Sequence, residues 1–297
     1  MAKDNGETPK GLCYNSAISD TAYPNARSVV SEHRSCQKVW YVKDTQLIGG
    51  ERIALGDGVP SILWRGKGDG PRPAVISVHG QGGSKQDIFP GWIERYAPMG
   101  ITVVTIDAYL HGEWARDGFT IKDDDTYRPE HGMESLIQTA SSLTHVVADL
   151  GEDEAIDEQR IGLRGGSLGG FIVLAAAVLG AKARAILSVC GGGNYEAEFP
   201  FLKAGNVVVS SGDSLSLLDI DPVTHATQIW PRPLLLIHGI KDESVPISCD
   251  RTVYDALAPL YRDKPGDCLF LTHSGGHETP MDLEDLGWAW LVRRLTD

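Results

Sequence analysis

The chain has 297 residues, with 40 acidic against 27 basic side chains and a formal net charge of −13 at pH 7. This balance excludes broad contact with nucleic-acid phosphates, which needs clustered Lys and Arg, and disfavours binding to anionic membranes. Hydrophobic residues make up 42% of the chain, enough for a sizeable core, and the length allows one large domain or two small ones.

The first segment, residues 1–36, is polar and rich in turn-forming residues, so we expect an N-terminal arm. Its start has no apolar stretch, and no signal peptide is predicted. The longest apolar run, Phe171–Leu179, is far shorter than the roughly twenty residues of a membrane span. Five scattered cysteines without a CxxC pair are typical of reduced thiols. A cytoplasmic location is therefore predicted, with a secreted chain that has lost its signal as the alternative.

Short β-rich runs begin after this arm. Val39–Val42 and Ser61–Trp64 flank a turn signal at Gly56–Gly58 and predict antiparallel strands. Further runs, apolar on both faces, are typical of parallel strands covered by helices. These runs are residues 74–78, 101–106, 160–163, 185–189, 234–237 and 268–271.

Helical patterns separate these strands. Residues 133–150 and 253–260 carry apolar side chains at helical spacing, and 168–179 and 282–295 are also predicted as helices. The alternation of strand and helix predicts a doubly wound α/β fold with right-handed crossovers. We expect a mostly parallel sheet of about eight strands with helices on both faces. Because no linker divides it, the segment 37–297 is predicted to be a single domain.

The most specific motif is G-x-S-x-G at Gly165–Gly169, between the strand at 160–163 and the helix at 168–179. This is the context in which a nucleophilic serine projects its Oγ above a sheet. Glycines keep side chains out of the tight turn, and the helix N-terminus offers N–H groups to a developing oxyanion. Ser167 is therefore the candidate nucleophile, with a glycine-rich turn and an incidental serine as the alternative.

A second glycine-rich loop, His79–Ser84, follows the strand at 74–78. Acyl-transfer hydrolases aim two N–H groups at the substrate carbonyl, one after the nucleophile and one from an earlier loop. The candidates for this oxyanion hole are the N–H groups of Leu168 and Gln81, with Gly82 as the alternative for the second. A phosphate-binding loop or a plain turn would be the other interpretations, and the G-K-[ST] ending of a P-loop is missing.

Two further candidates follow the last two predicted strands. Asp242 is a carboxylate that could orient a histidine and stabilise its imidazolium, with Glu243 as the fallback. His277 lies in a glycine-flanked loop before the final helix, and His273 competes with it from the strand end. The order of serine, aspartate and histidine along the chain is that of the α/β-hydrolase triad.

The motifs resemble the α/β-hydrolase superfamily over about residues 37–297, and within it the dienelactone-hydrolase-like and prolyl-oligopeptidase-like esterases. The segments that carry the resemblance are His79–Gly83, Asp107–Gly112, Gly165–Gly170, Asp242–Pro246 and Gly276–His277. The resemblance implies Ser167 as nucleophile, His277 as general acid and base and Asp242 as orienting acid. Dienelactone hydrolases have cysteine at the serine position, so their substrate is not implied. The long propeller region of oligopeptidases is also missing.

Other segments are expected to surround the site. In the family, Asp107–Gly112 braces it, so Asp107 and His111 are expected to be structural, with substrate contact as the alternative. Two long stretches, 113–132 and 191–231, are predicted lid or cap segments, although a solvated loop would explain the first equally well. The expected substrate-binding residues are Tyr109, Trp114 and Tyr195.

The predicted function is a serine hydrolase that cleaves a carboxylic ester, or a related acyl bond, of a small molecule through an acyl-enzyme on Ser167. The same triad would serve an acyltransferase, a lactonase or a C–C hydrolase, and a non-catalytic binding protein of this fold is the remaining alternative. No cofactor and no metal are expected. Neither nucleic acid nor a membrane is an expected partner, and the sequence does not indicate an oligomeric state.

Overall fold

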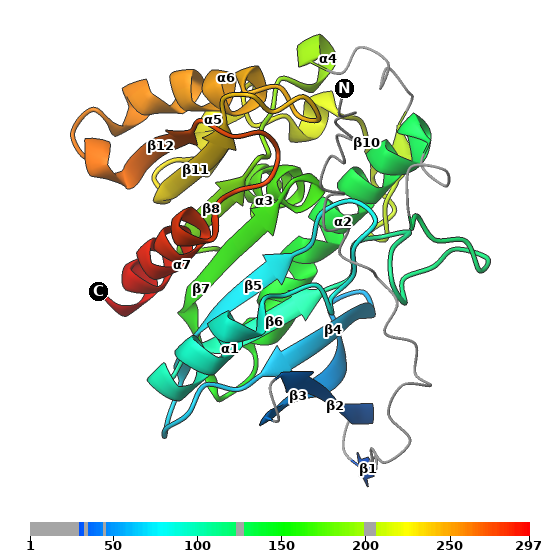
Figure 1. Ribbon diagram of the computed structural model, residues 1–297. Helices are drawn as coiled ribbons and strands as arrows, with labels where there is room; N and C mark the ends of the chain where they lie inside the picture. The colour runs from blue at the N-terminus through cyan, green and yellow to red at the C-terminus, as the bar shows by residue number, and fades with distance from the viewer. Residues whose placement is uncertain (1–29, 33–34, 44–45, 123–127, 199–205) are drawn as a thin grey trace, which may run out of the picture.

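A ten-stranded sheet forms the centre of the computed structural model, which describes residues 30–32, 35–43, 46–122, 128–198 and 206–297 (Figure 1). The strand order is β1-β2-β3-β4-β6-β5-β7-β8-β11-β12. The six strands from β6 to β12 run parallel, and β1 to β4 join them antiparallel. The strands are β1 (Val30–Glu32), β2 (Ser35–Lys43), β3 (Gln46–Leu55), β4 (Val59–Trp64), β5 (Arg72–Val78), β6 (Thr102–Ile106), β7 (Ile156–Gly166), β8 (Ala185–Val189), β11 (Leu234–Gly239) and β12 (Cys268–His273).

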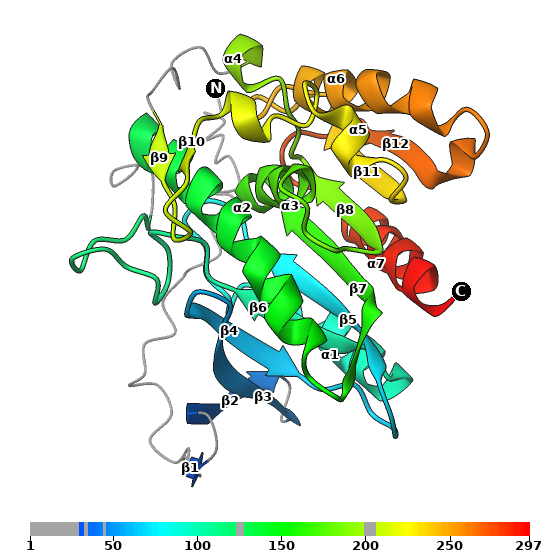
Figure 2. The same ribbon diagram turned by 180° about the vertical axis from the view of Figure 1, so that it is seen from behind.

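Helices cover both faces of this sheet (Figures 1 and 2). On one face, α1 (Pro90–Tyr96) and α7 (Met281–Thr296) meet through Trp92 and Trp288, whose rings stack 4.9 Å apart. On the other lie α2 (Pro129–Gly151), α3 (Leu168–Val178) and α6 (Ser248–Leu257). Shorter elements are η1 (Ala97–Met99), α4 (Tyr195–Glu198), η3 (Leu218–Ile220), α5 (Ala226–Ile229), η4 (Ala258–Tyr261), η5 (Pro265–Asp267) and a hairpin of β9 (Val207–Val208) and β10 (Ser214–Leu215).

The predicted α/β-hydrolase fold is confirmed, with differences in detail. Strands β6, β8 and β11 are buried along their whole length, as parallel strands covered on both faces must be. The sheet has two strands more than expected, β1 and β3. Polar and glycine residues interrupt the apolar pattern of β3, because it is an antiparallel strand near the edge of the sheet. Its sequence therefore lacks the continuous apolar run of a strand covered on both faces. Helix α1 was also not predicted, because seven residues give too short a periodic pattern.

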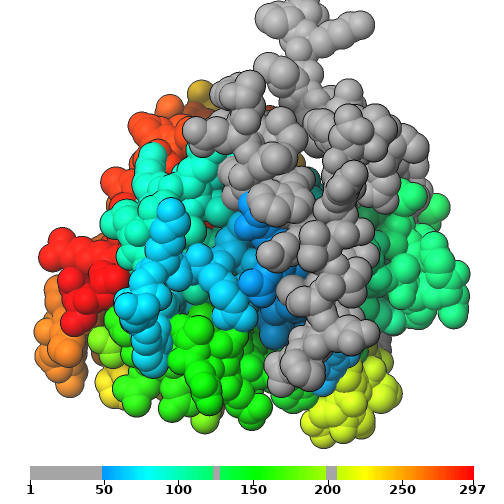
Figure 3. Space-filling view, turned by 90° about the horizontal axis from the view of Figure 1, so that it is seen from below, coloured from blue at the N-terminus to red at the C-terminus, as the bar shows by residue number. Residues whose placement is uncertain are grey.

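The structure describes only part of the predicted N-terminal arm and of the two predicted lid segments. Of the predicted arm, residues 1–29 and 33–34 lie outside the described residues, and its remainder forms β1 and the start of β2. The predicted lid segments 113–132 and 191–231 contain residues 123–127 and 199–205, which are likewise not described. Residues 113–122 of the first segment loop away from the sheet, and Figure 3 shows them on the opposite side of the molecule from α7. Residues 129–132 already belong to α2.

Within the described residues, no helix has both the length and the apolar character needed to cross a membrane.

Candidate active site

Ser167 occupies a strained turn between β7 and α3. Its backbone has φ 53° and ψ −121°, a conformation that non-glycine residues rarely adopt and that is found where function requires it. The turn is possible because its neighbours lack side chains: a Cβ on Gly165 would lie 2.0 Å from the Gly169 carbonyl oxygen. A Cβ on Gly169 would in turn lie 2.2 Å from the carbonyl oxygen of Val78, the last residue of β5. The sequence therefore forces the Ser167 side chain out of the sheet.

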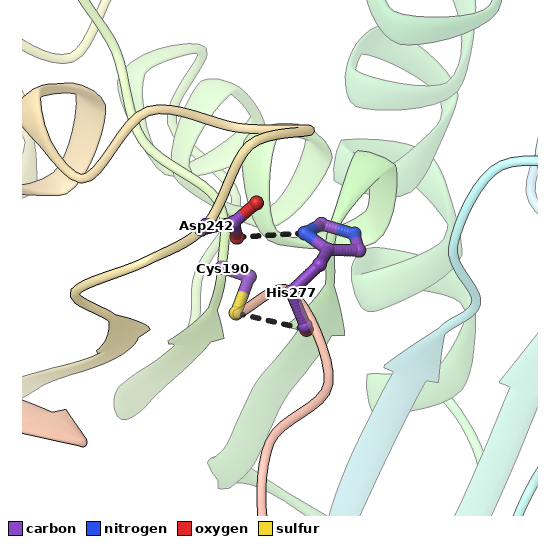
Figure 4. A group of neighbouring side chains, drawn as sticks. All are labelled: Cys190, Asp242 and His277. Carbon is purple, nitrogen blue, oxygen red and sulfur yellow. Dashed lines mark hydrogen bonds and ion pairs between the residues drawn. The ribbon is translucent and has the colours of Figure 1, made fainter. Parts of the chain in front are cut away.

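Three side chains from distant loops form a continuous hydrogen-bonded relay. The Nε2 atom of His277 lies 3.0 Å from Ser167 Oγ, and its Nδ1 atom lies 2.7 Å from Asp242 Oδ2. Figure 4 shows the second of these contacts. The loop after β11 carries Asp242 and the loop after β12 carries His277, so parallel strands bring both to the same edge of the sheet.

The acid of this relay is held as a carboxylate. The N–H groups of Ser244 and Val245 donate to Asp242 Oδ1 at 2.9 and 2.8 Å, which leaves Oδ2 for His277. Burial of the Asp242 carboxylate raises its pKa, but hydrogen bonds from the Val245 N–H and from His277 lower it by more. The resulting pKa lies below the ordinary value of aspartate. The group is therefore charged at neutral pH and can stabilise a protonated imidazole.

The two competing residues from the sequence lie elsewhere. Glu243 is exposed, whereas its neighbour Asp242 is buried against His277. The Nδ1 atom of His273 accepts the Gly275 N–H at 3.1 Å, which fixes this ring within its own turn.

The loop with the proposed oxyanion donors approaches the serine closely. A Cβ on Gly80 would lie 3.4 Å from Ser167 Cβ, and Gln81 lines the pocket in front of the serine. The second donor, the N–H of Leu168, belongs to the first residue of α3, where backbone N–H groups have no intrahelical partner. Gln81 thus lies at the pocket in front of Ser167 and Leu168 follows the serine directly in the chain, and their role as oxyanion donors stays a prediction.

His79 connects this loop to the segment after β6. Its Nδ1 lies 2.6 Å from the Gly80 carbonyl oxygen, and its Nε2 accepts the Ala108 N–H at 3.0 Å. This pattern needs a neutral ring with the proton on Nδ1. Burial lowers the pKa of His79, which favours the same neutral state. Both ring nitrogens of His79 are thus engaged by backbone groups, which gives this histidine a structural role.

The segment after β6 also braces the loop. The buried Asp107 carboxylate accepts Lys85 N–H at 2.8 Å, Lys85 Nζ at 2.5 Å and Glu113 N–H at 2.8 Å. His111 is fully buried, and its Nδ1 lies 2.9 Å from the Tyr109 carbonyl oxygen. These contacts agree with the structural roles expected for Asp107 and His111.

A pocket of about 250 Å³ opens in front of Ser167 and His277. Its wall contains a charged pair: Arg164 Nη2 donates to both carboxylate oxygens of Glu284, at 2.8 and 3.0 Å. Sequence reasoning missed this pair because its members lie 120 positions apart and neither belongs to a motif.

The expected substrate-binding residues lie outside the described lining of this pocket. Tyr195 is buried in the core, where its ring lies 6.0 Å from that of Phe171. Tyr109 and Trp114 pack edge to face against each other, with ring centres 5.4 Å apart. These three aromatic side chains thus pack against other rings, and their position in predicted loops does not distinguish packing from substrate binding.

Cys190 lies beside the acid–histidine pair. Each of Cys190, Asp242 and His277 offers one atom that could bind a metal ion, and these three atoms lie within 4.8 Å of one another (Figure 4). The Cys190 thiol donates to the His277 carbonyl oxygen at 3.4 Å, and Asp242 and His277 bond each other. Burial raises the pKa of this thiol to about 11, so it is neutral at physiological pH. These hydrogen bonds account for the cluster without a further ligand.

Comparison with known proteins places this site in a family. The model of the prolyl oligopeptidase family matches residues 137–295, more than half of the chain and the part that carries Ser167, Asp242 and His277. The chain belongs to the prolyl oligopeptidase family. The match confirms the resemblance to the prolyl-oligopeptidase-like branch of the α/β hydrolases.

Individual relatives cover most of the chain. Esterase YjfP of Escherichia coli (strain K12) is 26% identical over 216 residues, 68% of this chain and 82% of that protein. The crystal structure of TT1662 from Thermus thermophilus covers 84% of this chain and 98% of its own, with a TM-score of 0.65 and 23% identity. Acetyl xylan esterase from Paenibacillus sp. R4 gives a TM-score of 0.60 at 19% identity, covering 87% and 88%. The two structures show a shared fold.

Proposed function

We propose that this member of the prolyl oligopeptidase family is a serine hydrolase that cleaves a carboxylic ester of a small molecule. The observation that carries the proposal is the relay from Ser167 Oγ through His277 to Asp242, with contacts of 3.0 and 2.7 Å. The strained backbone of Ser167 supports it, because such strain is retained where it presents a reacting group. A relative named as an esterase supports an ester as the substrate.

The reaction would follow from the positions of these groups. His277 Nε2 accepts the Ser167 proton as Oγ attacks the ester carbonyl carbon, and Asp242 stabilises the imidazolium that forms. The N–H groups of Gln81 and Leu168 would bind the oxyanion. His277 then returns the proton to the departing alcohol, which leaves an acyl-enzyme. A water molecule, activated by the same histidine, releases the acid and restores the serine.

The experiment that tests this proposal compares wild type with Ser167→Ala on p-nitrophenyl acetate. We expect kcat to fall at least about 10⁴-fold, because the nucleophile is lost and the fold is retained. Ser274→Ala is the matched control, since Ser274 is an exposed serine in the loop of His277. Full activity of Ser167→Ala would reject the serine as nucleophile.

A second measurement separates an enzyme from a binding protein of the same fold. A fluorophosphonate should label wild type on Ser167 and leave Ser167→Ala unlabelled, because labelling needs an activated serine. An unlabelled wild type without hydrolytic activity would favour the binding protein. A panel of esters, thioesters, lactones and amides, each with an added alcohol as acyl acceptor, then distinguishes ester hydrolysis from the other reactions of the same triad.

A further inference from the structure

A second buried histidine lies directly behind the acid of the relay. His238, near the end of β11, is fully buried. Its Nδ1 atom lies 2.8 Å from Asp250 Oδ2. Its Nε2 atom lies 2.9 Å from the Val245 carbonyl oxygen and 3.4 Å from Asp242 Oδ2. Each ring nitrogen thus faces oxygen atoms that accept hydrogen bonds.

This arrangement determines where the protons are. A neutral imidazole has one donor and one acceptor nitrogen, whereas an imidazolium donates from both. With a neutral His238 and an ionised Asp250, one lone pair would point at the Asp250 carboxylate or at the Val245 carbonyl oxygen. Such a contact is repulsive inside a protein, where water cannot screen it. With Asp250 on α6 ionised, the contacts therefore favour an imidazolium. A protonated Asp250 would instead donate to Nδ1 of a neutral ring, so the two states differ in whether Nδ1 carries the proton.

The groups around His238 raise its pKa, which favours the imidazolium. Burial lowers the pKa of His238, but its bond to Asp250 and the charge of that carboxylate raise it by more, so that the pKa lies above the ordinary value. The thiols of Cys190 and Cys249 are the next ionisable groups, and burial raises the pKa of both. Both are neutral, so the carboxyl groups that face His238 are those of Asp250 and Asp242. Burial raises the pKa of Asp250, and the bond to His238 and the charge of that ring lower it by less.

The two backbone groups of Val245 connect His238 to the proposed acid, Asp242. Its carbonyl oxygen accepts from His238 Nε2, and its own N–H donates to Asp242 Oδ1 at 2.8 Å. The imidazolium therefore holds the residue whose N–H binds one oxygen of Asp242, and its Nε2 atom lies 3.4 Å from the other oxygen.

We infer that His238, held as an imidazolium by Asp250, is a positioning residue that fixes Asp242 as an oriented carboxylate for the reaction. This inference rests on the proposed function, because the relay matters only if Ser167 reacts. His238 touches neither Ser167 nor the pocket, and its effect passes through Asp242 to His277.

The inference makes a specific statement about pH. The positive charge of His238 opposes protonation of His277, because both cations would adjoin the same carboxylate. Without that charge, the acidic limb of kcat/KM should move to higher pH, a change that loss of packing alone would not produce.

The test uses His238→Gln and Asp250→Asn in the full chain. Asp250→Asn keeps a neutral hydrogen bond to the ring and removes the charge that retains its second proton. We expect both variants to lose about 100-fold in kcat through misplacement of Asp242, with KM unchanged and the acidic limb roughly one pH unit higher. His145→Gln is the matched control, because it breaks an exposed histidine–aspartate pair with Asp57. A lower kcat with an unmoved limb would overturn the inference.

A second measurement needs neither a variant nor activity. Nitrogen-15 NMR of the wild-type chain at pH 8 should show both ring nitrogens of His238 protonated, and an unprotonated nitrogen would overturn the inference. If wild type shows no hydrolysis that depends on Ser167, the proposed function fails, while the NMR result still decides the state of His238. If hydrolysis is present and the NMR shows a neutral ring, the inference alone fails.

Discussion

The backbones of Gly239 and Gly276 are in direct contact: a Cβ on Gly239 would lie 2.0 Å from the Gly276 carbonyl oxygen. Beside this contact, the Lys241 N–H donates to the Gly275 carbonyl oxygen at 2.9 Å. The contact joins the loop of the proposed acid to the loop of the proposed base. It therefore sets how closely the two side chains approach.

Gly239→Ala tests the importance of this approach. The added methyl group must push the two loops apart, because the atom that it meets belongs to the backbone. Misplacement of His277 by about 1 Å should lower kcat about 100-fold, as measured on a p-nitrophenyl ester. Gly266→Ala is the matched control, since no neighbouring atom lies within 4 Å of its Cβ position. An unchanged kcat in Gly239→Ala would show that the contact does not set the geometry.

The choice of acid can be tested on two adjacent residues. Asp242→Asn should lower kcat by about 10⁴-fold, because an amide cannot stabilise the imidazolium and favours the wrong tautomer of His277. Glu243→Gln should have little effect, since this side chain is exposed. Steady-state kinetics of the two purified variants decides the matter. The reverse order of effects would transfer the role to Glu243.

The buried pair behind the oxyanion loop should govern stability. Lys85→Met leaves Asp107 charged and without its cation in a site where both side chains are almost fully buried. We expect a loss of about 3–5 kcal/mol in the free energy of unfolding, measured by urea denaturation. Lys67→Met, at an exposed position, is the control. Equal stabilities of the two variants would mean that Asp107 does not depend on Lys85.

The parts of this molecule that could be predicted from its sequence are those with local signals. Buried parallel strands are short continuous apolar runs, and the predicted bounds of β8 match the structure. Ser167, Asp242 and His277 each follow a strand end, and glycines mark the places where backbones must approach closely. Their meeting could be predicted because parallel strands all end at one edge of the sheet.

What could not be predicted depends on packing between distant segments. Arg164 and Glu284 meet because α7 lies across the sheet beside β7, and neither residue belongs to a motif. His238 gains its role from Asp250 on α6, 12 positions away and on a different element. The burial of Tyr195 likewise follows from its contact with Phe171 in the core. Such relationships exist only in three dimensions.

The pocket beside Ser167 predicts a preference for short acyl groups. Its volume of about 250 Å³ is below the usual range of about 300–1,000 Å³ for small-molecule sites. The charged pair of Arg164 and Glu284 in its wall would also be costly to cover with a long alkyl chain. We expect acetyl and propionyl p-nitrophenyl esters to have a higher kcat/KM than the octanoyl ester. Faster cleavage of the octanoyl ester would place the acyl group outside this pocket.

His111 should make stability depend on pH. Burial, together with the nearby His79, lowers its pKa to about 4, against an ordinary value of 6.5. Between these two values the unfolded chain binds a proton that the folded protein does not, so stability should fall as pH decreases from about 6.5 to 4. A shift of this size corresponds to roughly 3 kcal/mol. His111→Gln should therefore lose less stability than wild type over this range, as urea denaturation at several pH values would show. A constant difference between the two curves would mean that His111 titrates normally in the folded protein.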